Sequence, residues 1–213
     1  MKTIFSIAVA LASTLCLGTA AQAQDNTVKL AVSVYQPHAQ NDGVYGIGIP
    51  PGADVTISSA TTAVFTYERM FTPNVGVELV LGVPPRLKAN AAGSLSFLGD
   101  DVFSAKVVSP TLLVNYHFFE PGSTWRPYVG AGLNYTRFTS IQSSISSNVQ
   151  MGDSFGWALQ AGVAYAVTKE FGLFASIAGA QVKSNVVSSG NTVLTTTIDV
   201  RPIIYSFGVS YAF

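Results

Sequence analysis

The sequence predicts an all-β fold, an eight-stranded antiparallel transmembrane β-barrel, on three observations. Charged residues make up only 10% of the chain, well below the roughly 25% usual for soluble domains. Beyond residue 23 the sequence has no apolar run of about 18 residues, the length that a membrane-spanning helix requires. Several segments alternate between large apolar residues and small or polar ones. A closed barrel accounts for all three observations, because its backbone polar groups pair between strands.

The N-terminus predicts export from the cytoplasm. Lys2 is followed by an apolar run over residues 4–17 and then by the small-x-small sequence Ala21-Gln22-Ala23. This order is typical of a secretory signal peptide. We therefore expect residues 1–23 to be cleaved and residues 24–213 to form the barrel.

Cysteine usage and charge exclude further classes of protein. Cys16 is the single cysteine and lies in the segment to be removed. The bulky Leu15 before it argues against a lipoprotein signal, which has a small residue there. The mature chain is thus expected to lack disulfide and thiol chemistry. Removal of Lys2 from 11 basic residues leaves ten against 11 acidic ones, so the net charge of the mature chain is near zero. With no block of like charge, it offers no basic face for a nucleic-acid partner.

The alternation is clearest over residues 154–167. One face carries mostly large side chains, Phe155, Trp157, Leu159, Ala161, Val163, Tyr165 and Val167. The other carries Ser154, Gly156, Ala158, Gln160, Gly162, Ala164 and Ala166. Residues 125–136 and 203–213 alternate in the same way. Successive side chains of a strand point to opposite faces, so each segment has one large-residue face and one small-residue face.

The spacing of aromatic residues favours a membrane barrel over a soluble β-sandwich or soluble barrel. Three strands each carry two aromatic residues that bracket mostly aliphatic ones on the same face. At about 3.3 Å per residue and a tilt near 40°, these spans cover roughly 20–25 Å, the height of a lipid-facing band. We therefore expect a membrane girdle that comprises Trp125, Tyr135, Trp157, Tyr165, Tyr205, Tyr211 and Phe213.

Turn signals give the number of strands and their orientation. We expect strands near residues 27–36, 59–70, 75–84, 107–119, 125–139, 153–167, 171–183 and 192–213. Short turns at 72–74, 120–123 and 168–170 alternate with long loops, rich in Gly, Ser, Asn and Pro, at 37–58, 85–106, 140–152 and 184–191. Since short turns are periplasmic in outer-membrane barrels, both ends of the barrel chain are expected in the periplasm.

Three prolines fall inside the predicted strands, where a closed barrel has no free edge to accommodate them. We expect Pro110 and Pro202 to lie above the membrane, where strands extend into the loops. Pro127 lies near the periplasmic start of its strand, and the pattern offers no further reason for it.

Two adjacent segments resemble the core signature of the OmpW family. They are Ser-Pro-Thr-Leu-Leu-Val-Asn-Tyr-His-Phe over 109–118 and Trp-Arg-Pro-Tyr-Val-Gly-Ala-Gly-Leu-Asn-Tyr-Thr-Arg-Phe over 125–138. Residues 74–79, 153–157 and 208–213 are similar to further family segments. The resemblance covers roughly residues 62–213 and leaves the first long loop, 37–58, unmatched.

The resemblance implies an eight-stranded barrel in the outer membrane of a Gram-negative bacterium. Its narrow apolar interior would carry small hydrophobic compounds and release them sideways into the bilayer through the barrel wall. Expected partners are small hydrophobic molecules, outer-membrane lipid and lipopolysaccharide. The terminal Phe213 also resembles the signal that the barrel-insertion machinery reads.

Charged residues on the inward faces predict a polar floor. Glu68 and Glu78 stand equally far from the turn at Pro73, so they should oppose each other on neighbouring strands. His117 and Arg126 flank the next short turn at similar depth. Two adjacent carboxylates are destabilising without a counter-charge. Arg126 is therefore expected to neutralise at least one of them.

Above this floor the inward residues predict a narrow apolar channel. It comprises Val80, Leu113 and Ile204, with Gly130, Gly132 and Gly162 leaving room. An eight-stranded barrel is filled by side chains or holds one small ligand. Because a path straight down would desolvate charged groups, a sideways exit is expected. The same residues would also serve as filler in a barrel without transport.

Two other classes of function are considered. A pore-less structural, adhesive or receptor barrel would share every strand feature and act through its extracellular loops. A hydrolase would need a nucleophile, a base and an orienting acid. His38 lies in a loop without a motif, and His117 has no serine at matching depth, so the chain is not expected to be an enzyme. No cluster has metal-ligand spacing, and no cofactor is expected.

Overall fold

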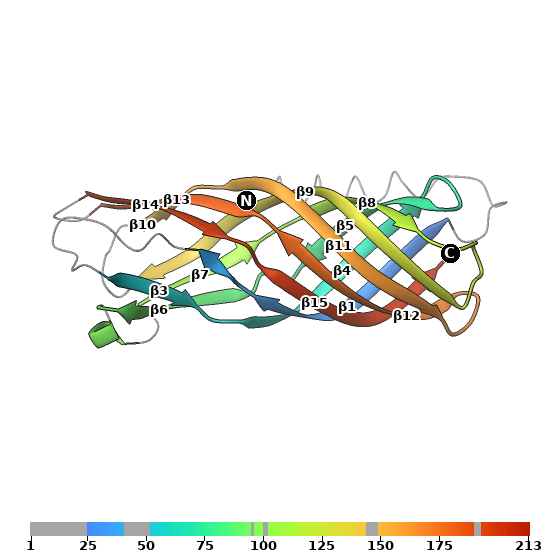
Figure 1. Cartoon of the computed structure of the whole chain (residues 1–213), viewed down its shortest axis with the longest axis horizontal. Helices are drawn as coiled ribbons and strands as arrows, with labels where there is room; N and C mark the ends of the chain where they lie inside the picture. The colour runs from blue at the N-terminus through green and yellow to red at the C-terminus, as the bar shows by residue number, and fades with distance from the viewer. Residues whose placement is uncertain (1–24, 41–51, 95, 100–101, 144–148, 190–192) are drawn as a thin grey trace.

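The computed structural model describes residues 25–40, 52–94, 96–99, 102–143, 149–189 and 193–213. Most of these residues are in strands. The 3-10 helix η1 (Ser96–Leu98) lies at the end of the molecule opposite the C-terminus (Figure 1). Among the residues described, no helix is long and apolar enough to cross a membrane. The predicted signal peptide, residues 1–23, lies outside the described part of the chain.

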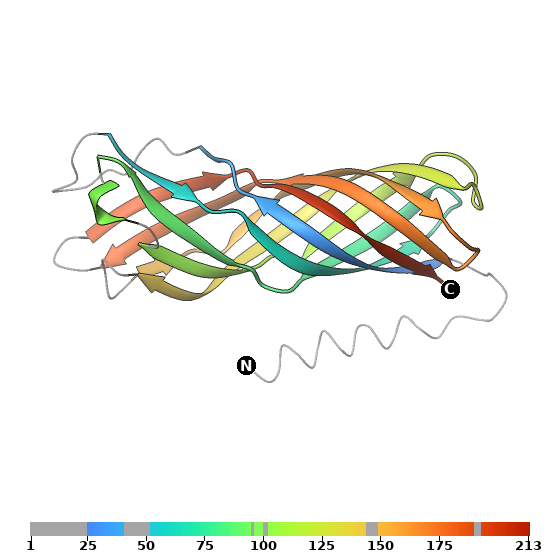
Figure 2. The same ribbon diagram turned by 90° about the horizontal axis from the view of Figure 1, so that it is seen from below.

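Eight strands close into an antiparallel barrel (Figures 1 and 2). In chain order they are β1 (Asn26–Gln36), β4 (Ala60–Met70), β5 (Val75–Gly82), β8 (Thr111–His117), β9 (Trp125–Ser143), β11 (Ser154–Ala166), β12 (Phe171–Ala180) and β15 (Ile203–Ala212). Each pairs with its neighbour along the chain, and β1 pairs with β15 from Thr27–Ala212 to Gln36–Ile203. The predicted eight-stranded antiparallel β-barrel is confirmed.

The large side chains face outward, as the alternation predicts. On β11, Phe155, Trp157 and Leu159 are exposed on the outer surface, whereas Ser154 and Ala158 are buried inside. This outer surface is the one that lipid covers in a membrane barrel, so its apolar character satisfies the hydrocarbon layer. Both ends of the barrel chain and the three short turns lie at the same end, which is the periplasmic end in such barrels (Figure 2).

The extracellular end is more ordered than the sequence pattern predicts. The described residues form seven further strands there: β2 (Ala39–Gln40), β3 (Ala53–Ile57), β6 (Arg86–Gly93), β7 (Phe103–Val108), β10 (Val149–Met151), β13 (Val182–Ser189) and β14 (Val193–Val200). The loop assignments for 85–106 and for parts of 37–58, 140–152 and 184–191 were therefore wrong. These hairpins rise above the lipid band, so they need no alternation between large and small residues.

Two of the three prolines interrupt strands. Pro110 separates β7 from β8, and Pro202 separates β14 from β15, so predicted strands 107–119 and 192–213 are each divided. Pro127 lies inside β9 opposite Val163. Its carbonyl accepts the N–H of Phe118 at 2.8 Å, so its nitrogen faces the same way, toward Phe118. Phe118 is one residue beyond the end of β8. The missing donor therefore removes only the reciprocal bond of this last pair and leaves the β8–β9 ladder itself intact.

Candidate functional site

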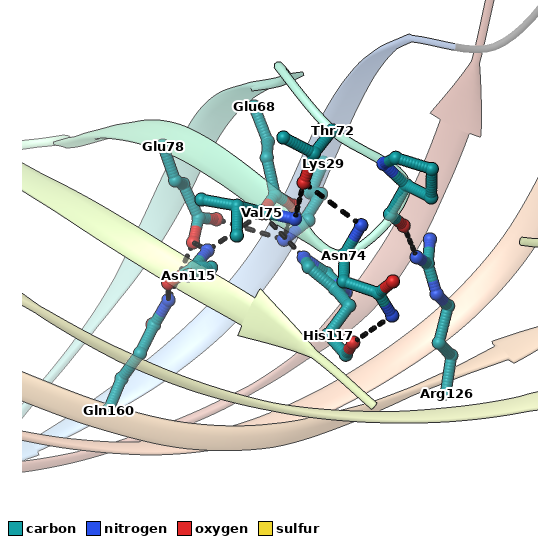
Figure 3. Close-up of polar contacts among 11 residues, drawn as sticks. Lys29, Glu68, Thr72, Asn74, Val75, Glu78, Asn115, His117, Arg126 and Gln160 are labelled. Atoms are coloured by element: carbon teal, nitrogen blue, oxygen red, sulfur yellow. Dashed lines mark hydrogen bonds and ion pairs between the residues drawn. The ribbon is translucent and has the colours of Figure 1, made fainter. Parts of the chain in front are cut away.

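The interior contains two opposed carboxylates and one lysine between them. Glu68 of β4 and Glu78 of β5 are register partners, and each is 2% exposed. Lys29 enters from β1, and its Nζ lies 2.9 Å from Glu68 Oε2 and 3.0 Å from Glu78 Oε1 (Figure 3). Lys29 itself is only 5% exposed. One buried cation thus holds two buried carboxylates that would otherwise repel each other.

Amide and imidazole side chains from two other strands also bind the carboxylates. Asn115 Nδ2 donates to Glu68 Oε1 at 2.8 Å and to Glu78 Oε2 at 2.7 Å. Gln160 Nε2 donates to Glu78 Oε2 at 2.6 Å and to Asn115 Oδ1 at 2.8 Å. His117 Nε2 lies 2.7 Å from Glu68 Oε1. We call these six residues, Lys29, Glu68, Glu78, Asn115, His117 and Gln160, the polar floor.

The polar floor joins five strands across the lumen. Its members come from β1, β4, β5, β8 and β11 (Figure 3). Tyr128 closes the remaining side from β9: its ring stacks on His117 at 5.2 Å between centroids, and Lys29 Nζ lies 5.0 Å from its ring centroid. Because the members are hydrogen-bonded to one another from opposite walls, no member can move without breaking a buried polar contact.

Arg126 makes no direct ion pair with either carboxylate, unlike the arrangement predicted from depth. Its Nη2 donates instead to the carbonyl oxygen of Pro73 in the neighbouring periplasmic turn (Figure 3). Arg126 lies two residues nearer the periplasmic rim than Tyr128, the register partner of His117, where a turn carbonyl is within reach. Lys29 takes the predicted role. The signal for it was present, because Lys29 is the only charged residue in β1.

The three predicted channel glycines do not leave room for cargo, which is a second correction. A side chain at Gly130 would overlap the Asn115 amide, and one at Gly132 would overlap the backbone of Leu112. At Gly162 an added Cβ would lie 2.5 Å from Tyr128 Cζ. Neighbouring protein atoms occupy the space that these glycines provide, as expected in a close-packed interior.

A cavity of about 130 Å³ lies above the polar floor. Val80, Leu113 and Ile204 all line it, together with Phe174 and the floor residue Glu78. A buried apolar cavity of roughly 150 Å³ is large enough to bind benzene. The interior therefore has space for one small apolar molecule resting on a polar base.

The cavity also reaches an interruption in the barrel wall. The pairing of β5 with β8 ends at Val80–Thr111, and the next backbone bond across is Val107 N to the Pro85 carbonyl, 3.0 Å. No pairing joins residues 81–84 to residues 108–110, all of which the structure describes. We call this stretch the wall gap. Its residues Gly82 and Ser109 line the cavity.

Backbone geometry explains why the wall gap is unpaired. Pro84 and Pro110 have no N–H to donate. Val83 N donates to the Ala63 carbonyl of β4 at 2.9 Å. Because bonding directions alternate along a strand, the N–H of Gly82 points the other way, into the gap. The wall gap therefore retains a backbone donor without a ladder partner.

The predicted girdle residues lie on the outer surface at both ends of the lipid-facing band. At the periplasmic end, the rings of Trp125 and Tyr165 are 4.6 Å apart, and those of Tyr211 and Phe213 are 6.0 Å apart. At the opposite end, exposed aromatic side chains include Tyr135, Trp157 and Tyr205. Phe213 N also donates to the Asn26 carbonyl at 2.8 Å, which fastens the C-terminus to the first strand.

The residues described include no group of three or more His, Cys, Asp or Glu side chains placed to hold a metal ion. The polar floor has three such side chains, Glu68, Glu78 and His117, but Lys29 and Asn115 occupy the positions between them. Its carboxylates are therefore bound by an ammonium group and by amide donors of the protein.

Known proteins resemble the chain over nearly its full length. Outer membrane protein W of Vibrio cholerae serotype O1 is 29% identical over 221 residues, which covers 100% of this chain and 99% of that protein. The crystal structure of OprG from Pseudomonas aeruginosa aligns with a TM-score of 0.81 and 25% identity, covering 90% of this chain and 97% of that one. The solid-state NMR structure of AlkL in DMPC lipid bilayers aligns with a TM-score of 0.71 and 27% identity, covering 92% and 93%.

These relatives are named outer-membrane proteins. The solved structures of OprG and AlkL share the closed barrel described above. The family model described as "OmpW family" matches residues 22–213, which include every strand of the barrel. The chain is thus an outer-membrane β-barrel of a Gram-negative bacterium, and it belongs to the OmpW family.

Proposed function

We propose that this chain takes small hydrophobic molecules from the cell exterior into the interior cavity and releases them sideways into the bilayer through the wall gap. One observation carries the proposal: a single cavity, lined mainly by apolar groups, touches both the polar floor and the wall gap. Family resemblance supports the same class of cargo.

The polar floor argues against passage straight to the periplasm. An apolar molecule moving downward would have to separate Lys29 from Glu68 and Glu78, which are within 3.0 Å of it. Separating buried ions without a replacement partner costs several kcal/mol. An apolar cargo offers no hydrogen bond in return. The floor is therefore a barrier to cargo of this class.

The wall gap offers a route with a lower cost. Between residues 81–84 and 108–110 there is no backbone ladder to break. Leu81, Val83 and Leu112 are exposed on the lipid-facing surface around it. A molecule leaving there passes from an apolar cavity to an apolar solvent, so it is never transferred into water.

The test compares bulk added at two small residues whose side chains face the cavity. At Gly82, in the wall gap, an added Cβ makes ordinary contact with Val64 at 3.7 Å. Ala178, on β12 away from the gap, also lines the cavity and is the register partner of the inward-facing Gln160. We expect Gly82→Phe to slow transfer of a fluorescent aromatic hydrocarbon into vesicle membranes by about tenfold or more, the equivalent of about 1.4 kcal/mol, and Ala178→Phe to slow it much less. Equal slowing by both variants, or by neither, would contradict exit through the gap.

A receptor or adhesive role is the second candidate. The strands β10, β13, β14 and β2 form a separate four-stranded sheet at the extracellular end, which gives a partner an ordered surface. Replacing the segment 182–200 with a short turn distinguishes the two roles. Loss of binding of cells or phage with unchanged tracer transfer would favour the receptor role.

A further inference from the structure

A basic surface lies on the outside of the barrel just above the wall gap. It is formed by β6, β7 and the upper part of β9, residues 137–143, which pair side by side. These segments contain Arg86, Lys88, Lys106 and Arg137 and no aspartate or glutamate. In a chain with 11 basic and 11 acidic residues, that is a marked separation of charge. We call these four residues the basic patch.

The four side chains share the outer face. Arg86, Lys88, Lys106 and Arg137 are exposed, while Ala89, Ala105 and Val107, at the alternate positions, are buried. Arg86 and Lys106 are direct register partners, and Lys106 is opposite Thr139, two residues along β9 from Arg137. The cations therefore form one continuous surface across three strands.

Two cations directly opposite each other destabilise a strand pair unless an anion lies between them. The groups that the structure places against Arg86 are neutral: its Nη1 donates to Gln142 Oε1 at 2.6 Å and to Ser104 Oγ at 3.2 Å. These contacts hold the guanidinium against β7 and β9 and leave other N–H donors unused. At the edge of the patch, Arg137 Nε lies 4.0 Å from Asp153 Oδ1. The arrangement is thus oriented to accept an anion near Arg86 and Lys106.

The height of the patch identifies the anion. Arg137 follows the girdle residue Tyr135 by two positions, about 7 Å along the strand, on the extracellular side. Below Arg86, Val83 is 62% exposed on the lipid-facing surface, as are Leu81 and Leu112 nearby to a lesser degree. A ligand that fits has phosphates at the level of the patch and acyl chains that descend over this apolar surface. That is the construction of an outer-leaflet lipopolysaccharide.

We infer that the basic patch is a binding site for the phosphorylated glucosamine headgroup of lipopolysaccharide, with Arg86 and Lys106 holding one phosphate between them. Charge-assisted bonds from a guanidinium and an ammonium suit a phosphate, which has three acceptor oxygens. The bound lipid would stand beside the wall gap, so its acyl chains would form the bilayer surface immediately outside. The inference does not depend on transport, because the patch and the lipid surface exist whether or not the gap conducts.

The test measures binding of lipid A to the full chain in detergent or nanodiscs. Arg86→Gln/Lys106→Gln removes the central pair, and Arg69→Gln/Lys169→Gln removes two charges at the periplasmic end as a matched control. We expect the first variant to bind bisphosphorylated lipid A about tenfold more weakly or worse, and the control to bind it like the unaltered chain. The charge-preserving exchange Arg86→Lys/Lys106→Arg should retain most of the affinity.

Two further ligands show whether binding requires the phosphates and the acyl chains of lipid A together. Lipid A stripped of both phosphates should bind the unaltered chain about as weakly as bisphosphorylated lipid A binds the central-pair variant. Inorganic pyrophosphate should not compete at equal concentration, because it lacks acyl chains. Unchanged binding by the variant, equal binding of the dephosphorylated lipid, or equally tight binding of pyrophosphate would each overturn the inference. If the double variant fails to fold, two measurements still test the inference. They are binding of bisphosphorylated lipid A to Lys106→Gln and binding of dephosphorylated lipid A to the unaltered chain.

Discussion

The lower and upper halves of the barrel interior are held together in different ways. In the lower half, six polar side chains from five strands bond to one another across the lumen. In the upper half, a cavity of about 130 Å³ meets a stretch of wall without strand pairing. The same closed ladder of strands therefore encloses one region that polar bonds join across the lumen and one region that contains a cavity. Polar bonds across the lumen hold the floor together, whereas no backbone ladder joins residues 81–84 to residues 108–110 above it.

The largest effect is expected from removing the lysine of the polar floor. Lys29→Met leaves Glu68 and Glu78 opposed and buried without a cation, which should lower the free energy of unfolding by about 3–5 kcal/mol. Urea-induced unfolding in lipid vesicles measures it. As a control, Lys169→Met in an exposed turn should change stability by less than about 0.5 kcal/mol. A Lys29 variant as stable as the unaltered chain would show that the floor does not depend on this ion.

A smaller effect is expected from a methyl group added at Gly162. The new Cβ would lie 2.5 Å from Tyr128 Cζ and 2.8 Å from the Ala175 carbonyl oxygen, so the Tyr128 ring must shift. Overpacking of this kind costs about 1–3 kcal/mol. Gly82→Ala is the matched control, because its Cβ meets Val64 at an ordinary 3.7 Å. The same unfolding measurement applies, and equal stabilities for the two variants would contradict the difference in packing.

The smallest effect is expected in the exchange rates of backbone amides, compared between the wall gap and the paired part of the β5–β8 ladder. Glu78 and Leu113 are register partners within the β5–β8 ladder, whereas Gly82, on the same strand, faces the wall gap. We expect the Gly82 amide to exchange with deuterium about tenfold faster than those of Glu78 and Leu113, the equivalent of roughly one hydrogen bond. NMR of the chain in bilayers resolves these amides. Equal protection would mean that the gap is closed by bonds absent from the structure.

Alternation and turn symmetry made much of the fold predictable. The outward face of β11 follows from residues 154–167 alone, and the opposition of Glu68 and Glu78 follows from their equal distance from Pro73. The upper hairpins were not predictable in this way, because a strand outside the membrane has no lipid-facing side to impose large residues. The extracellular sheet could therefore be found only from the structure.

The interior was harder to predict than the wall. Counting from a turn gives the height of a side chain but not which partner it reaches, so Arg126 was assigned a role that belongs to Lys29. A glycine on an inward face indicates space beside the backbone, and the sequence does not say what fills it. At Gly162 the filler is Tyr128, which comes from a neighbouring strand.

The central claim is that apolar cargo leaves the cavity through the wall gap and does not cross the polar floor. Photolabelling with a small apolar diazirine tests this claim most directly. The reagent is supplied to the extracellular face of the chain in vesicles, and labelled residues are mapped by mass spectrometry. We expect label on cavity and gap residues such as Leu113, Gly82 and Ser109, and none on His117 or Arg126. Label on His117 and Arg126, with the wall gap unlabelled, would show that cargo passes straight through the floor.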